Sequence, residues 1–311
     1  MAVTCQAGSA PNTSRSRLLL FFVLSLCVFT YLFVATAWVV DDAYITFRTI
    51  ANFLSGHGLT WNVGERVQAY THPFWMFLLG LGVLLTKEYF YTALAVSFLV
   101  CLAVLTVAFV ELKDEAPWKS FLFFFLFMTS KAIVDYCSSG LENPLTYLLV
   151  MLFYSRYLKG QGVPRAFDES EGVRLFLIAA LSWLNRQDTI LLYLPGLATI
   201  VWQQWKARRW RLARTILVGW SPAIAWFLFS IFYYGFPFPN TAYAKMIGGS
   251  LSLLARLQRG SVYYLISLRW DAVAFLAILA SLVWAIRERQ WRPLHGLLGI
   301  LVYLAYVWAG A

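Results

Sequence analysis

The sequence predicts an all-α fold, a polytopic bundle of transmembrane helices, and three observations lead to it. Hydrophobic residues make up 60% and charged residues 13% of the 311 positions, a balance that excludes an ordinary soluble globular domain. Apolar runs recur along the whole chain. The formal charge of +10 comes from Lys and Arg in short clusters between those runs, which is typical of topology signals. No nucleic-acid partner is therefore expected.

The chain begins with a polar segment, residues 1–17, which we expect to be a disordered cytoplasmic tail. The apolar run after Arg15 and Arg17 is long for a signal peptide and has no small-residue cleavage site, so it is predicted to be an uncleaved first helix. The remainder, 18–311, is expected to form one transmembrane domain. Its apolar segments lie at 18–40, 74–86, 89–111, 119–134, 145–158, 173–185, 189–205, 214–234, 271–286 and 294–310.

The basic clusters orient these segments. Arg15 and Arg17 place the N-terminus in the cytoplasm, and the clusters at 206–214 and 287–292 belong on the same side. All three basic clusters can lie in the cytoplasm only if one early apolar segment does not cross the membrane. Segment 74–86 is the best candidate, because as a helix it spans about 20 Å against a hydrocarbon core of about 30 Å. We therefore predict about nine crossings and one interfacial half-helix.

This topology places the loops with chemically active side chains in one external layer. They are 41–73, 135–144, 185–188 and 235–270. The short cytoplasmic loops contain no P-loop or Rossmann glycine pattern, so no nucleotide-binding domain is expected. The four cysteines have no paired spacing and support neither a disulfide framework nor a metal site.

Asp41 and Asp42 open the first external loop, directly after a membrane helix. Charge at a bilayer boundary is costly, so adjacent carboxylates there suggest a function. Apolar residues over 41–55 recur with helical spacing, which predicts an amphipathic helix on the membrane surface. The simplest interpretation makes the acids its N-cap. A cap needs only one carboxylate, so the second must be hydrated, paired or used.

Further polar residues of the external layer have two interpretations each. The turn at His72 is expected to aim its imidazole back at the loop, and Glu142 either caps the next helix or acts in a site. Arg186 and Lys245 either extend to lipid headgroups or bind a phosphate. Asp188 is as well explained as a structural partner of Arg186 as by catalysis.

Several stretches together resemble a known family, the bacterial GT-C-type integral membrane glycosyltransferases, and most closely the terminal β-(1→2) arabinofuranosyltransferase-like proteins of cell-envelope assembly. The stretches that carry the resemblance are 41–48, 56–67 and 70–75 in the first loop, followed by 139–144, 185–188 and 239–245. It covers about 18–311 and implies a GT-C-like transmembrane domain in the bacterial inner membrane.

The sequence departs from the family pattern at two places. Gln187 stands where the family usually has proline. Residues 306–311 look like the start of a pattern that continues in the family to Gly-Gly-Asp-Phe-Met. We therefore expect a C-terminally truncated chain, which is inactive by itself if the missing part is needed.

The resemblance implies transfer of a sugar, arabinofuranose being one candidate, from a polyprenyl-phosphate donor to a glycan or lipid acceptor on the external, periplasmic face. Asp41 or Asp42 would be the catalytic base, with Asp41 favoured, and Glu142 and His72 would lie on the acceptor or metal side. The donor phosphate would be held by Arg186, Lys245 and Arg48. A divalent cation, Mg or Mn, is the candidate cofactor.

Two other classes of function remain open. Ionisable residues in a helical bundle also mark transport pathways, although the acids here lie in loops and no inverted repeat is visible. A non-catalytic, lipid-binding subunit of an envelope assembly complex is the third interpretation.

Overall fold

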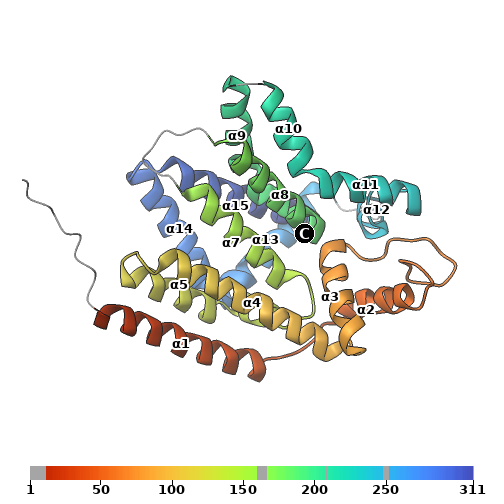
Figure 1. The fold of residues 1–311 in the computed structure, drawn as a ribbon, viewed down its shortest axis with the longest axis horizontal. Coiled ribbons are helices and arrows are strands. Elements are labelled where there is room, and N and C mark those ends of the chain that lie inside the picture. Colours follow the sequence, from red (N-terminus) through yellow and green to blue (C-terminus); the bar gives the residue numbers. More distant parts are fainter. Residues whose placement is uncertain (1–11, 160–166, 208, 248–251, 311) are drawn as a thin grey trace, which may run out of the picture.

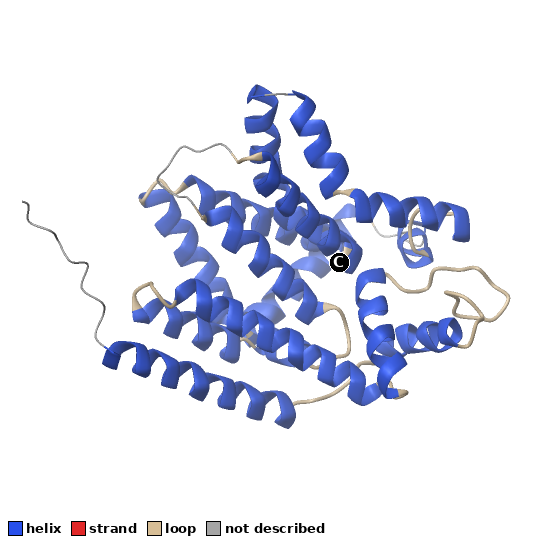
Figure 2. Cartoon of the chain, in the orientation of Figure 1, coloured by secondary structure: helices blue, strands red, loops and turns tan. Residues whose placement is uncertain are grey.

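The computed structural model describes residues 12–159, 167–207, 209–247 and 252–310. Every regular element in these ranges is a helix (Figure 2). The elements are α1 (Asn12–Ala35), α2 (Asp41–Leu54), α3 (Pro73–Thr86), α4 (Phe90–Leu112), α5 (Pro117–Thr129), α6 (Lys131–Cys137), α7 (Asn143–Leu158), α8 (Glu169–Asn185), the 3₁₀ helix η1 (Gln187–Thr189), α9 (Ile190–Ala207), α10 (Arg209–Gly219), α11 (Ser221–Tyr234), α12 (Asn240–Ile247), α13 (Leu253–Trp270), α14 (Ala272–Arg287) and α15 (Trp291–Gly310).

The predicted N-terminal tail needs one correction. Residues 1–11 lie outside the described part of the chain, but α1 already begins at Asn12. Residues 12–17 are therefore helical and not part of a disordered tail. A helix that is formed over an apolar run gains one backbone hydrogen bond for each residue added, so it extends beyond the run.

The helices identify an integral membrane protein. Three of them, α1, α4 and α15, are long and apolar enough to cross a membrane. Three bent pairs raise this number to six if each pair is one span: α5 with α6, α10 with α11, and α13 with α14, with bends of 68°, 59° and 98°. The predicted count of about nine crossings is not confirmed. The short apolar helix at 74–86 is present as α3 (Pro73–Thr86).

Apolar side chains form three buried clusters that hold the bundle together. The first lies beneath α2 and α3 and contains Ile50 and Trp75. The second joins α1 to α4, α5 and α6 through stacked and tilted phenylalanines, and α1 runs along that edge of the molecule (Figure 1). The third joins α7, α8 and α9. The first cluster carries the site.

The start of α2 differs from the interpretation in which Asp41 or Asp42 is the N-cap. Val40 is the N-cap residue, with extended backbone, and no side chain caps the helix. Asp41 and Asp42 occupy the first turn, where their negative charge interacts favourably with the helix dipole. Both side chains are exposed. The acids therefore do not cap α2, and their carboxylates are available for other contacts.

The loop between α2 and α3 packs on α11 through buried hydrogen bonds. The hydroxyl of Tyr234 donates to the carbonyl of Leu59 at 2.8 Å and lies 3.0 Å from the hydroxyl of Tyr70. Ser230 donates to the side chain of Gln68 at 3.0 Å. Each such bond contributes about 1 kcal/mol, and an unmade buried partner would cost more. The loop between α2 and α3 is thus fixed against α11, beside α2 and α3 (Figure 1).

Candidate functional site

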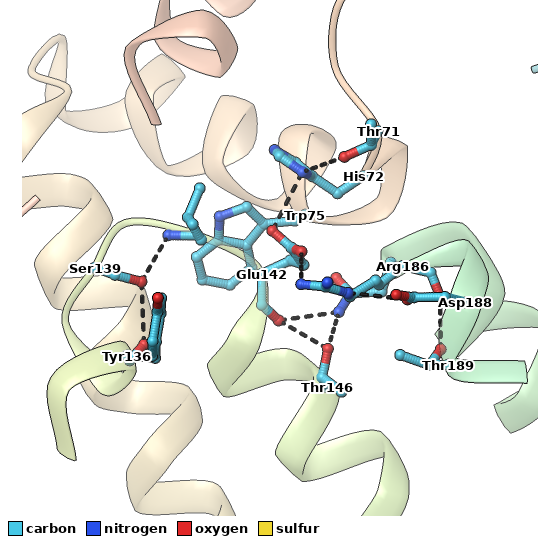
Figure 3. Close-up of polar contacts among 12 residues, drawn as sticks. Thr71, His72, Trp75, Tyr136, Ser139, Glu142, Thr146, Arg186, Asp188 and Thr189 are labelled. Atoms are coloured by element: carbon cyan, nitrogen blue, oxygen red, sulfur yellow. Dashed lines mark hydrogen bonds and ion pairs between the residues drawn. The ribbon is translucent and has the colours of Figure 1, made fainter. Parts of the chain in front are cut away.

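A continuous chain of polar contacts links three of the predicted site residues (Figure 3). The Oγ1 of Thr46 lies 2.6 Å from Nε2 of His72, and Nδ1 of His72 lies 3.2 Å from a carboxylate oxygen of Glu142. The other oxygen of Glu142 accepts from Arg186 Nη1 at 3.2 Å. Arg186 Nε donates to Asp188 at 2.9 Å. We call these five residues the polar relay.

The members of the polar relay are placed by helix ends. His72 is the N-cap residue of α3, before a proline at the first helical position, and Glu142 is the N-cap residue of α7. Arg186 is the C-cap residue of α8. The side chain of Glu142 makes no capping hydrogen bond, because it forms ion pairs instead. Glu142 therefore occupies the predicted cap position without capping.

Neighbouring side chains hold the loop before α7 in place. The indole N–H of buried Trp75 donates to the carbonyl of Gly140 at 2.9 Å. Asn185 Nδ2 donates to the carbonyl of Glu142 at 3.0 Å and to Thr146 Oγ1 at 2.9 Å. The backbone N–H of Val40 donates to the carbonyl of Ser139 at 3.0 Å. The start of α2 is therefore attached directly to the loop that carries Glu142.

Gly140 is required at this junction for two reasons. Its φ of +78° lies in the left-handed region that favours glycine. A Cβ there would also lie 3.0 Å from Val39 Cγ1 and 3.1 Å from Ala43 Cβ. The glycine thus allows the start of α2 to approach the relay closely.

Burial determines the charge of the polar relay. Burial lowers the pKa of His72 below its usual 6.5, and the charge of Arg186 lowers it further, while Glu142 and Asp42 oppose this shift. His72 is therefore neutral at pH 7. Burial also lowers the pKa of Arg186, but the carboxylates of Asp188 and Glu142 outweigh it and leave that pKa above its ordinary value. Arg186 remains a cation, and its side chain is 42% exposed while that of Glu142 is 6% exposed.

The two acids of α2 face different surroundings. Asp42 is four residues before Thr46, so both lie on the helix face that meets His72. The negative charge of Asp42 raises the pKa of His72, against the larger effect of burial. Asp41 is seven residues before Arg48 and shares the outward face with it. In the described residues no ion pair involves either acid, and Asp41 accepts only the backbone N–H of Asp42, at 3.0 Å.

Two predicted phosphate-binding residues are not part of the polar relay as described. Arg48 donates to Asn62 at 3.3 Å, and its guanidinium lies 4.5 Å from the centroid of the Trp61 ring. Lys245 belongs to α12, but its side chain lies outside the described part of the structure. Asp188 is the expected partner of Arg186.

Sequence reasoning missed two contributors to this region. Thr46 lies within the motif at 41–48, and its spacing from Asp42 would have placed it on the same face. Tyr303 of α15 donates to Asp188 at 3.3 Å. It lies in an apolar segment 115 residues further along the chain, and no local signal marks it.

An apolar cavity of about 590 Å³ adjoins the relay. It lies between α2, α3, the end of α8 and α11, and its lining includes Phe53, Phe74, Phe77, Leu184, Trp226 and Phe229. Phe74 follows His72 by two residues, and Leu184 precedes Arg186 by two. The lining of the cavity thus includes residues that are neighbours in the chain of His72 and Arg186.

Only some of the acidic side chains near the site are available as ligands for a metal ion. Among the described residues, no three His, Cys, Asp or Glu side chains group closely enough to hold one. Glu142 and Asp188 are already paired with Arg186. Asp41 and Asp42 offer exposed carboxylates, and Mg²⁺ is often held by one or two carboxylates together with substrate phosphate. The exposed carboxylates of α2 therefore fit a metal site that is completed by a substrate phosphate.

The fold and the site define a helical membrane protein with an acidic and basic cluster beside an apolar cavity. The chain is 28% identical over 225 residues to a terminal β-(1→2)-arabinofuranosyltransferase of Mycobacterium tuberculosis, covering 68% of this chain and 35% of that protein. It is 32% identical over 230 residues to the protein of the same name in Corynebacterium glutamicum, covering 67% of this chain and 33% of that one.

The chain is therefore similar to two terminal β-(1→2)-arabinofuranosyltransferases, which agrees with the resemblance that the motifs indicated. The match spans about one third of the length of these relatives. No family model matches the chain. No solved structure matches it either.

Proposed function

We propose that the chain is a membrane glycosyltransferase that transfers a sugar, with arabinofuranose the first candidate, from a polyprenyl-phosphate donor. The acceptor is a cell-envelope glycan or a lipid, and the reaction takes place on the external face of the bacterial inner membrane. One observation carries the proposal: Arg186 is a partly exposed cation held by two carboxylates, and Leu184, two residues before it, lines an apolar cavity. Asp41 and Asp42 are exposed acids in the first turn of α2.

The donor would bind with its phosphate at Arg186 and its isoprenoid chain in the cavity. A guanidinium forms strong charge-assisted hydrogen bonds with phosphate, and here Glu142 and Asp188 fix its orientation. Each methylene that leaves water for an apolar site contributes about 0.8 kcal/mol. A cavity of about 590 Å³ thus favours a lipid-linked donor. We keep Lys245 as a second candidate for the phosphate.

Asp41 is the proposed base. It would take the proton of the acceptor hydroxyl as that oxygen bonds to the anomeric carbon, while the bond from this carbon to the phosphate oxygen breaks. Polyprenyl phosphate leaves with the bonding electrons, and Arg186 stabilises its charge. Neutral His72, between Thr46 and Glu142, would help to position the acceptor.

Charge balance supports a divalent cation at this site. The guanidinium of Arg186 is paired with two carboxylates, those of Glu142 and Asp188, and Asp41 and Asp42 add two more acidic groups in the first turn of α2. This excess of negative charge disfavours a phosphate unless a cation is added. Asp42 would hold Mg²⁺ or Mn²⁺ together with the donor phosphate, while Asp41 remains the base. When bound, the ion would neutralise the charge that develops on the leaving phosphate.

The proposal is tested with the purified chain in sealed liposomes. A radiolabelled polyprenyl-phosphate arabinofuranose and a membrane-impermeant glycan acceptor should yield labelled product. A nucleotide-linked sugar should yield none. Solute flux without transfer would replace the proposal by a transporter, and donor binding without transfer would replace it by a lipid-binding subunit.

A further inference from the structure

The outward face of α2 carries a second group of interacting side chains, distinct from the polar relay. Arg48 lies with its guanidinium 4.5 Å from the Trp61 ring centroid and donates to Asn62 Oδ1 at 3.3 Å. Asn62 Nδ2 in turn donates to Glu65 Oε2 at 3.1 Å. These four residues, which we call the outer platform, are polar and aromatic and are not buried.

The outer platform is attached to α2. Asn52 Nδ2 donates to the carbonyls of Thr60 and Trp61, at 2.9 and 3.0 Å. The backbone N–H of Glu65 donates to the carbonyl of Asn62 at 3.1 Å, which closes the turn. These bonds fix the loop on the helix, so a ligand would meet side chains that are already ordered. Less conformational entropy is then lost on binding.

The platform and the proposed base lie along one side of α2. Asp41 and Arg48 are seven residues apart, which brings them to the same helix face about 10 Å apart along the axis. Tyr44 lies between them on this side, with 52% of its surface exposed. Asp41, Tyr44 and the outer platform therefore form an exposed stripe whose length suits a short oligosaccharide.

The chemistry of the stripe fits a neutral saccharide. Aromatic faces such as Tyr44 and Trp61 pack against the apolar faces of sugar rings. Amide, carboxylate and guanidinium groups supply hydrogen-bond donors and acceptors for hydroxyl groups. The charges of Arg48 and Glu65 balance one another in the platform, which disfavours an anionic headgroup.

We propose that this stripe is the acceptor subsite, in which the outer platform binds a neutral glycan chain and presents its terminal hydroxyl to Asp41. The inference rests on the proposed function, whose acceptor it places. It assigns Arg48 and Trp61 to acceptor binding and not to the donor phosphate.

Binding of an arabinofuranose oligosaccharide of about five units, measured by calorimetry on the detergent-solubilised chain without donor, tests the subsite. Trp61→Ala and Arg48→Met should each raise the Kd about five- to tenfold, since a stacked ring or a charge-assisted bond contributes about 1 to 1.4 kcal/mol and each ~1.4 kcal/mol is a factor of ten. Trp118→Ala removes an indole that is 62% exposed on α5 and should leave the Kd unchanged. A gluco-oligosaccharide of equal length tests selectivity and should bind more weakly.

The two proposals fail in different ways. Equal Kd values for wild type, Trp61→Ala and Arg48→Met, or no binding by wild type, would overturn the subsite whether or not transfer occurs. Binding that the two variants weaken, in a chain that transfers no sugar, would support the subsite and refute only the enzymatic function. Thermal unfolding of each variant establishes that it is folded, and Arg48→Lys should recover part of the affinity because it restores the cation.

Discussion

Replacing Arg186 by methionine perturbs both the stability and the chemistry of the site. The substitution keeps most of the side-chain volume but removes the guanidinium from between Glu142 and Asp188. Glu142 is then left buried, with His72 as its remaining polar side-chain neighbour. We expect the variant to be less stable than wild type and to lose transfer activity.

The magnitude follows from burial. Removing one partner of a fully buried ion pair costs about 3–5 kcal/mol. The Glu142 side chain is 6% exposed but that of Arg186 is 42% exposed, so water already screens the pair and about 2 kcal/mol is a better expectation. Transfer should fall by about 100-fold or more, because the leaving phosphate loses a preorganised cation. The pKa of His72 should rise, since Arg186 lowers it and Glu142 raises it.

The assay compares Arg186→Met with Arg174→Met on the same helix, whose guanidinium is 59% exposed and pairs with Glu171. Thermal unfolding in detergent gives the stability difference, and initial rates with lipid-linked donor give the activity. Nuclear magnetic resonance of the three histidines follows the pKa of His72. If the two variants matched in stability and rate, the reasoning from the polar relay would be refuted.

Three further predictions concern the geometry and charge of the site. Gly140→Ala should destabilise the chain by about 1–3 kcal/mol because of its backbone conformation and close contacts; Gly64→Ala, with positive φ but open space, should cost less in the same thermal unfolding assay. Stability should decrease as the pH falls below about 6.5, the unfolded value for His72, because the unfolded state takes up the proton first; in His72→Gln this slope should be reduced, and an unchanged slope would contradict the buried neutral imidazole. Chelation of divalent cations should lower transfer and added Mg²⁺ should restore it, whereas full activity in a chelator would rule out a metal site shared between Asp42 and the donor phosphate.

Local patterns predicted the parts of the fold that position the site. Helical spacing over 41–55 predicted α2, and the apolar run at 74–86 predicted the short helix α3. Basic clusters placed Glu142, Arg186 and His72 in one layer, and the structure brings these three side chains into contact. These signals depend on hydrophobicity and charge, which can be determined from the residues of a single segment.

Features that depend on distant contacts or on backbone direction could not be predicted in this way. Hydropathy measures the apolar content of a segment but not a bend, so the breaks near Ser130 and Trp220, inside the predicted segments 119–134 and 214–234, were missed. Helix α13 (Leu253–Trp270) lies in the stretch 235–270 that was predicted to be a loop. The N-cap interpretation of the acids, one of the two that the sequence left open, was wrong because α2 begins one residue earlier than expected: Val40 is the N-cap residue, and its backbone N–H is bonded to Ser139. Such contacts join residues far apart in sequence, and only packing reveals them.

The rate of sugar transfer by Asp41→Asn tests the central claim most directly, with Asp135→Asn as the control. Asp135 is an acid of the predicted external layer that pairs with Lys131. A general base contributes about 100- to 10,000-fold, so Asp41→Asn should lower the single-turnover rate from the polyprenyl-phosphate donor by at least about 100-fold while donor binding stays unchanged. The control should retain the wild-type rate. Undiminished transfer by Asp41→Asn would contradict the proposal that a base on α2 activates the acceptor.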